Sequence, residues 1–329
     1  MKITDFKGTY CRLIEPTSQQ GKEDMFLAGE NRYTASQDNF AKIPGSPIAY
    51  WLGKHMFSTF ESKKMAESFI IRNGISTGDN VRYLRFWYEI NPQEYWKPCN
   101  KGGSYRKWYG NNDYFVYWRD NGYDIRTSLD DKGRIKARLG GLEYSFSKGI
   151  EMSRVTSGKL AFRYSQAGFV FESSTNDIFQ KEKSCDLYVA LGYCNSIIVN
   201  TLLNVMNPTI NIMPEDIRKL PWLDKHIKIE NNVRCIVEEN ISISRTDWDA
   251  FETSWDFNKH PLIQSTATIT EAYDDWKNEC NERFTTLKAN EEELNRIFID
   301  IYGLQAELTP TVADKDVTVA RIYDTKDDI

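Results

Sequence analysis

The chain has 329 residues, of which 40% are hydrophobic and 27% are charged, and its formal net charge is −5. This composition is that of a globular protein and excludes a disordered chain, a collagen and a coiled-coil rod, while the length predicts two domains. The sequence contains no leader pattern and no apolar stretch of about 18 residues, so we expect a soluble, cytoplasmic protein with no membrane contact.

Charge is divided unevenly along the chain. Residues 72–163 contain 17 Lys plus Arg against 10 Asp plus Glu, whereas residues 247–329 contain 8 against 19. Aromatic residues alternate with the basic ones in the first block, which favours a nucleic-acid surface, because cations displace counterions from phosphate and rings stack on bases. The alternative is a β-rich domain with naturally aromatic strands and solvated charges. We expect the acidic end to face away from DNA or to dock on basic protein.

The amino-terminal 45 residues predict short strands. Ser46 is a good cap for a helix that would contain Ile48 to Met56. The loop 72–80 contains two glycines and small polar residues, which free backbone amides to approach a phosphate or a base edge, although such a loop is more often only a turn. A strand is expected from Val81 to Ile90.

The middle of the chain is predicted to be mostly β. Turn residues recur between Tyr95 and Phe179, which indicates short strands. Cys185 to Met206 predicts a buried helix, and Met213 to Trp222 a second, short helix with Pro214 in its first turn. The 6 cysteines lack metal-ligand or redox spacing and are expected to be reduced thiols.

The last segment predicts acidic helices. Ser244 and Asp247 have the spacing of a capping box, Asn290 is a good cap for a later helix, and Gly303 should stop that helix. An apolar stripe on it is typical of a core or of a face that binds a partner helix. The stripe contains Leu294, Ile297, Phe298, Ile301 and Tyr302.

Catalytic motifs are sparse in the sequence. The 3 histidines have no second ligand or base at a useful spacing, and there is no phosphate-binding loop and no dinucleotide-binding glycine motif. Asn91-Pro92 and Asn207-Pro208 are followed by Gln93 and Thr209, whereas an amino-methyltransferase needs Asn-Pro-Pro and an aromatic residue to hold a flipped base. We therefore expect a binding module without catalytic, cofactor-binding or metal residues.

Several segments carry a family resemblance. They are Ile43–Trp51, Gly78–Asn80 ahead of Arg82 and Arg85, Lys107–Asn111, Ser157–Phe162 with Arg163 and Tyr164, Asn207–Thr209, Trp248–Phe257 and Leu287–Leu304. With them the chain resembles the BREX phage-defence adenine-specific DNA methyltransferases of the PglX family along nearly its whole length.

The resemblance implies a fold and a division of labour. In that family a catalytic domain with the S-adenosylmethionine pocket and an Asn-Pro-Pro-Tyr motif precedes the matched region, and this chain lacks both. The resemblance implies an α+β fold, with a mixed β-rich target-recognition domain at 1–243, similar to TaqI-type and type I specificity domains, and a helical carboxyl-terminal spacer at 244–329. The chain is then an expressed fragment or a natural partial copy, and we expect it to be inactive alone.

The resemblance also implies partners. The whole enzyme would use S-adenosylmethionine to methylate the exocyclic amine of one adenine in a short asymmetric site, marking self DNA in phage defence. The partners would be double-stranded DNA, the missing amino-terminal methyltransferase domain and other BREX proteins; the stripe 294–302 would pair with one of these proteins. The alternative is a protein-interaction subunit that assembles BREX or restriction-modification partners, with incidental DNA contact.

Residues that could read DNA lie in two loops, since Arg can pair with guanine and Asn with adenine in the major groove. The candidates for base reading are Asn73, Ser76, Thr77, Asp79 and Asn80 in the first loop, and Arg106, Lys107, Asn111 and Asn112 in the second. The candidates for phosphate contact are Lys101, Arg134, Lys136, Arg138, Lys159 and Arg163. For each of them the alternative is a solvated surface charge.

Overall fold

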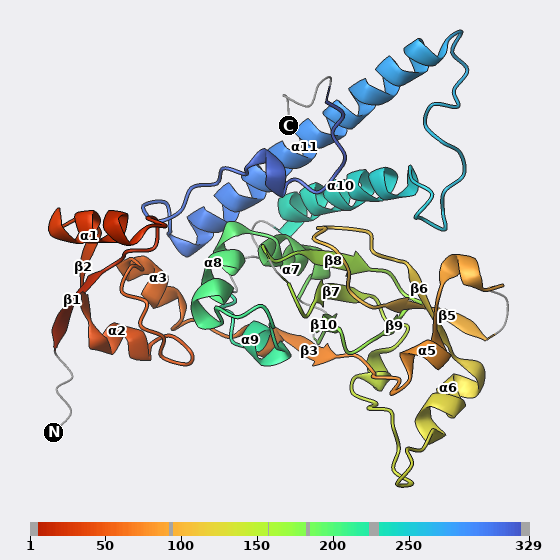
Figure 1. Ribbon diagram of the computed structural model, residues 1–329, viewed down its shortest axis with the longest axis horizontal. Helices are drawn as coiled ribbons and strands as arrows, with labels where there is room; N and C mark the ends of the chain where they lie inside the picture. The colour runs from red at the N-terminus through yellow and green to blue at the C-terminus, as the bar shows by residue number, and fades with distance from the viewer. Residues whose placement is uncertain (1–5, 92–94, 157, 182–184, 224–229, 324–329) are drawn as a thin grey trace.

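The structure is a computed structural model that describes residues 6–91, 95–156, 158–181, 185–223 and 230–323 (Figure 1). It has an α+β fold, as the resemblance implied, with a two-stranded sheet, two four-stranded sheets and helices that cover one of them. All six cysteines are free thiols, as the sequence predicted.

The amino-terminal unit is a small α/β hairpin followed by short helices. Its elements are β1 (Lys7–Cys11), α1 (Gln19–Leu27), β2 (Arg32–Ser36), α2 (Gln37–Ala41), α3 (Lys54–Thr59) and α4 (Met65–Ser68). The expected helix over Ile48 to Met56 is wrong, because Ser46 has a φ of +50° and is no cap. Instead α3 begins after Gly53, where the carboxylate of Glu307 accepts the His55 amide at 2.9 Å.

The first four-stranded sheet is antiparallel throughout and forms the main core. In spatial order its strands are β3 (Phe69–Asn73), β10 (Thr175–Gln180), β7 (Gly149–Ser153) and β8 (Phe162–Ser165). Three helices pack on it or beside it: α7 (Leu187–Cys194), α8 (Ile197–Met206) and α9 (Pro214–Arg218). The α9 helix starts at Pro214, as the sequence predicted.

The second four-stranded sheet forms a lobe with a smaller core. In spatial order its strands are β4 (Leu84–Phe86), β6 (Tyr114–Tyr117), β5 (Trp96–Asn100) and β9 (Val170–Phe171), and α5 (Asn80–Tyr83) and α6 (Arg119–Thr127) flank it. The single strand expected over Val81 to Ile90 is wrong in its first part, because the Asp79 carboxylate accepts the Arg82 amide at 3.1 Å and starts α5 instead.

The helix expected over Cys185 to Met206 is buried but consists of two helices. The side chain of Asn195, between them, bonds both the amide and the carbonyl of Phe162 on β8 at 2.9 Å, which ends α7 at the sheet. In the described part of the chain no helix by itself is long and apolar enough to cross a membrane; α7 and α8 together pass that test by length and composition, with a bend of 65° between them.

Two long helices form the outer layer, α10 (Glu230–Asp249) and α11 (Ile269–Tyr302), which lie side by side in Figure 1. Gly303 ends α11 with a φ of +68°, as predicted, but the predicted caps are wrong, since Ser244 and Asp247 lie inside α10 and Asn290 lies inside α11. The expected boundary at 243/244 also falls inside α10, and one hydrophobic core includes residues from both sides of it. We therefore keep that division only as a proposal about the roles of the two segments.

Candidate nucleic-acid interface

The loop after β3 lies beside a projecting hairpin, residues 128–138. Ser76 and Arg138 exchange two backbone hydrogen bonds, of 2.7 and 2.9 Å. A Cβ atom at Gly78, which has a φ of +72°, would stand 2.6 Å from the Cβ of Lys136. Glycine is therefore required for this close approach, because it alone adopts that φ without steric cost and adds no atom at the contact.

The surface formed there is rich in cations. The side chains of Arg72, Arg82, Lys136 and Arg138 are exposed, together with Asn80 at the start of α5. We call these five residues the basic edge. In the described part of the chain none of its four cations forms an ion pair, so their charge is available to an external anion.

The remaining candidates of the first loop are largely used inside the fold. Asn73 donates its amide to the carbonyl of Thr175 at 2.9 Å, and Thr77 is fully buried and donates to Asn80 at 2.6 Å. Asp79 is the cap of α5. The burial of Thr77 excludes it as a base reader, and only Asn80 among the five candidates is exposed.

The second predicted loop is not a DNA surface. Lys107, Asn111 and Asn112 are 7%, 3% and 8% exposed. The ammonium of Lys107 lies 2.5 Å from a carboxylate oxygen of Glu291 on α11, and the Asn111 amide donates to the Ser104 carbonyl at 2.9 Å. As base readers these residues are wrong, because all three are buried and Lys107 joins the β-rich region to α11.

Arg106 is also engaged inside the fold. Its guanidinium forms an ion pair of 2.6 Å with Asp247 on α10 and lies 5.0 Å above the ring of Trp248. This contact holds the last turn of α10. In the segment after the helix, Trp255 packs on Phe115 of the second sheet, with ring centres 5.2 Å apart. Arg106 therefore positions elements of the fold, and the prediction that it reads guanine is corrected.

Four of the six predicted phosphate contacts form ion pairs within the chain. Arg163 is 1% exposed and donates to Glu151 at 2.8 Å, which excludes contact with phosphate. Lys101 lies 3.7 Å from Glu172, and Lys159 is paired with Asp316. Arg134 is exposed at the tip of the hairpin but forms an ion pair of 2.8 Å with Asp130, so Lys136 and Arg138 are the candidates that remain without an ion pair in the described residues.

The apolar stripe of α11 binds this chain itself. Leu294 and Phe298 are 2% and 0% exposed, and the ring of Tyr302 stacks on Tyr193 of α7 with ring centres 5.5 Å apart. Ile297 and Ile301 pack against the same core. The expectation that this stripe pairs with another protein is wrong, since α7 and α8 already cover it.

A row of charged side chains crosses the first sheet and ends at Arg72 of the basic edge. Arg163, Glu151, Asp177 and Arg72 are successive cross-strand neighbours on β8, β7, β10 and β3. Burial, with the Glu151 carboxylate next to it, raises the pKa of Asp177 well above its usual value. Glu151 Oε2 and Asp177 Oδ1 are both buried without a hydrogen-bond partner in the described residues.

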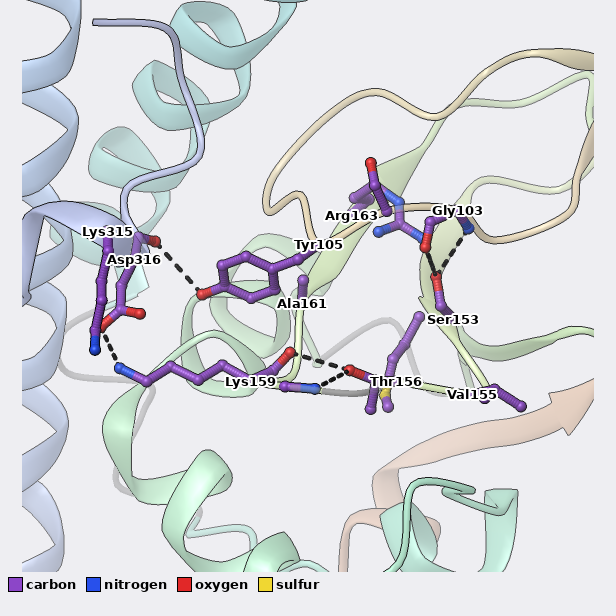
Figure 2. A pocket seen from close by; sticks show the side chains of 13 residues that line it. Gly103, Tyr105, Ser153, Val155, Thr156, Lys159, Ala161, Arg163, Lys315 and Asp316 are labelled. Atoms are coloured by element: carbon purple, nitrogen blue, oxygen red, sulfur yellow. Dashed lines mark hydrogen bonds and ion pairs between the residues drawn. The ribbon is translucent and has the colours of Figure 1, made fainter. Parts of the chain in front are cut away.

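A cavity of about 310 Å³ opens between the turn 103–105, the β7–β8 connection and the residues 315–316 (Figure 2). Lys159 pairs with Asp316 across it, and the Tyr105 hydroxyl donates to the Asp316 carbonyl at 3.4 Å. Ser153 accepts the Gly103 amide at 3.0 Å. Because these polar groups bond to one another, we interpret the cavity as a gap in the packing between the β-rich region and the carboxyl-terminal segment, and not as a ligand site.

The Asn-Pro pair that lies wholly within the described residues, Asn207-Pro208, is engaged inside the fold. At Asn207-Pro208 the side-chain amide donates to Asp216 at 2.8 Å and to the Asn211 carbonyl at 3.1 Å, and its oxygen accepts from Thr209. Asn91-Pro92 lies at the edge of the described residues. With its amide group engaged in this way, Asn207 does not fit the role of holding a flipped adenine.

Sequence reasoning missed part of the basic edge. Arg72 is the first residue of the predicted loop and Arg82 lies two residues after it, but their exposure depends on where β3 and α5 end. A signal for the hairpin was present, because the turn Asp130 to Gly133 separates two short alternating runs. It could not show that Leu129 and Ile135 would stay exposed.

Comparison with known proteins places the chain beside DNA-modifying enzymes. No protein-family model matches it. It is 37% identical to the adenine-specific methyltransferase PglX of Lacticaseibacillus casei (strain Zhang), over 97% of this chain and 29% of that protein. It is 27% identical to the adenine-specific methyltransferase BrxX of Escherichia coli O9:H4 (strain HS), over 92% of this chain and 25% of that protein. These relatives confirm the family resemblance, and the chain spans less than a third of their length.

Among solved structures, the type IIL restriction-modification enzyme MmeI, determined in complex with DNA, aligns with 73% of this chain and 33% of its own. The TM-score is 0.42 and the sequence identity 11%, a likeness too weak to carry a structural argument.

Proposed function

We propose, for a chain that is related along its length to part of the PglX and BrxX adenine-specific methyltransferases, that it is a DNA target-recognition module. In this role it binds double-stranded DNA and positions it for a catalytic domain that lies elsewhere in the whole protein. The observation that carries the proposal is the basic edge, where Arg72, Arg82, Lys136 and Arg138 stand exposed without ion pairs in the described part of the chain.

The cations of the basic block differ in whether the fold neutralises them. Much of the positive charge of residues 72–163 is neutralised inside the fold, since Arg106, Lys107 and Lys159 pair with acidic residues of the last segment. The 128–138 hairpin, which carries Lys136 and Arg138 of the basic edge, projects away from α10 and α11 (Figure 1). A polyanion meets less repulsion from the acidic helices on that side than elsewhere.

A working arrangement follows from the residue types on this surface. The cations of the basic edge would hold the register on phosphate, and Asn80, beside them, is an amide that can pair with adenine in the major groove. Methyl transfer would use S-adenosylmethionine bound by the catalytic domain of the whole enzyme, in the bacterial cytoplasm, together with other phage-defence proteins.

The experiment is a titration of short random-sequence duplexes with this chain at several salt concentrations. Replacing Arg82, Lys136 and Arg138 by Glu should weaken binding and make the slope of log K against log salt shallower by roughly 2.7, since each lost phosphate contact removes about 0.9. These side chains are exposed, so circular dichroism should show unchanged folding.

The matched control reverses three exposed lysines outside the basic edge, Lys22, Lys54 and Lys259, to Glu. The change in net charge is the same, and we expect it to alter the slope far less. Equal effects of the two triple variants, or no duplex binding by the unmodified chain at low salt, would overturn the proposal.

A second candidate function is protein assembly, which one observation favours. The β1–α1–β2 unit, at the far left of Figure 1, exposes Phe6, Ile14, Phe26 and Leu27 at 49% to 73%. Single exposed apolar residues are common, but four on one small unit are suited to contact with the catalytic domain or another protein. Replacing Phe26 and Leu27 by Ser should leave duplex binding unchanged and weaken that association in the whole enzyme.

A further inference from the structure

The hairpin next to the basic edge has a well-defined tip. Leu129 and Ile135 form an antiparallel bridge, and the backbone bonds Asp130 N to Arg134 O and Lys136 N to Ser128 O measure 2.7 and 2.9 Å. The carboxylate of Asp130 accepts the amides of Lys132 and Arg134 at 2.9 and 2.8 Å. Gly133 closes the turn with a φ of +73°. A ribbon held in this way keeps its shape when it meets a partner.

The two faces of the hairpin differ in chemistry. Side chains of successive strand residues point to opposite faces, so Leu129 and its cross-strand neighbour Ile135 share one face. The other face carries Arg134, Lys136 and Arg138. Leu129 and Ile135 are 55% and 57% exposed, whereas Ala137, on the same face nearer the base, packs against the core of the second lobe. The tip therefore presents an unpartnered apolar pair backed by cations.

The cations indicate the partner of this apolar pair. The hairpin 128–138 contains four exposed cations, Lys132, Arg134, Lys136 and Arg138, against two acidic residues, Asp130 and Asp131, and only Arg134 pairs with one of them, Asp130, at 2.8 Å. An apolar protein surface would gain nothing from these cations, whereas a DNA groove is walled by phosphates on both sides. The major groove admits a two-stranded ribbon, and the C5-methyl of thymine is the apolar group that it exposes.

We propose that the 128–138 hairpin enters the major groove of double-stranded DNA, where Leu129 and Ile135 pack against thymine C5-methyl groups. This inference rests on the proposed function, because it assumes that the basic edge binds a duplex. The hairpin cations take the phosphates that flank the groove. Leu129 and Ile135 are then specificity-determining residues that distinguish thymine from cytosine and from uracil.

The test removes only the methyl groups from the DNA. Short random-sequence duplexes are made with either thymine or uracil in both strands. The affinity of the full chain is then measured for the thymine duplex and for the uracil duplex. Loss of each buried methyl should weaken binding about fourfold, so the thymine duplex should bind roughly 4- to 16-fold more tightly. Replacing Leu129 and Ile135 by Ser should abolish this preference.

The matched control replaces two isoleucines on other segments by Ser: Ile210, which is 62% exposed, and Ile263, which is 63% exposed. This variant should keep the thymine preference. If the unmodified chain binds both duplexes equally, with affinity that still falls with salt, the methyl inference is wrong and the proposed function stands. If neither duplex binds with salt dependence, the proposed function itself fails. An unchanged thymine preference in the Leu129 and Ile135 variant assigns the apolar pair to another partner and also overturns the inference.

Discussion

Asp177 lies in the middle of the first sheet, between Glu151 on β7 and Arg72 on β3. Because burial raises its pKa, the native state binds a proton there that the unfolded state releases near its ordinary value of 3.8. The contribution of this group to stability is therefore fully present below pH 3.8 and is lost as the pH rises toward the raised native pKa.

We predict that Asp177→Asn removes this loss. The neutral amide can accept the Thr175 hydroxyl, as Asp177 does at 3.1 Å, and can donate to the unpartnered oxygen of Glu151. The free energy of unfolding, measured with urea between pH 4 and pH 8, should rise for the variant relative to the unmodified chain as the pH increases. Parallel curves across this range would show that Asp177 is ionised in the folded protein.

At the residue scale the sequence predicted which side chains are charged but not which charges are free. Lys107 and Lys136 are both lysines of the basic block and cannot be told apart by sequence alone. In the structure Lys107 is 7% exposed and pairs with Glu291, whereas Lys136 is exposed on the hairpin. The difference arises from contacts between residues 184 positions apart, which no local pattern encodes.

The element that sets this difference is α11. Glu291, which is 4% exposed, accepts the ammonium of Lys107 and, at 2.8 Å, the indole N–H of Trp108, so one carboxylate on the helix holds two residues of the β-rich region. A buried ion pair is costly to form, but removing one partner leaves a buried charge without compensation.

We therefore predict that Lys107→Ala destabilises the chain by about 3–5 kcal/mol, which urea unfolding would measure. The double variant Lys107→Met with Glu291→Gln should recover most of that loss, because the glutamine oxygen still accepts the Trp108 N–H and no charge is buried. If the double variant is less stable than the single variant, the loss in Lys107→Ala does not come from the unpaired charge of Glu291, and this explanation of how α11 docks is wrong.

Elements were predictable where a local signal decides them. Pro214 starts α9 and Gly303 ends α11, and both act through their own backbone geometry. The helix expected from Ser46 and the single helix over 185–206 were wrong, because Glu307 and Phe162, distant in sequence, supply the hydrogen bonds that decide where α3 begins and α7 ends.

At the scale of the whole molecule, the division between a basic block and an acidic end has two uses. The expectation that the acidic segment docks on basic protein is confirmed within this chain, through Arg106 with Asp247 and Lys159 with Asp316. Four of the cations that form no ion pair in the described residues make up the basic edge, and the 128–138 hairpin that carries two of them points away from α11 (Figure 1). Composition could predict the charge asymmetry, but the surface that keeps its charge follows only from the fold.

The most direct test of the central claim is hydrogen exchange of the full chain with and without a random-sequence duplex at low salt. We predict slower exchange of backbone amides in residues 74–82 and 128–138 on adding DNA, and no change in residues 104–112, which α10 and α11 cover. Protection confined to residues 104–112, or to the acidic helices, would contradict the assignment of the basic edge and its hairpin as the DNA-binding surface.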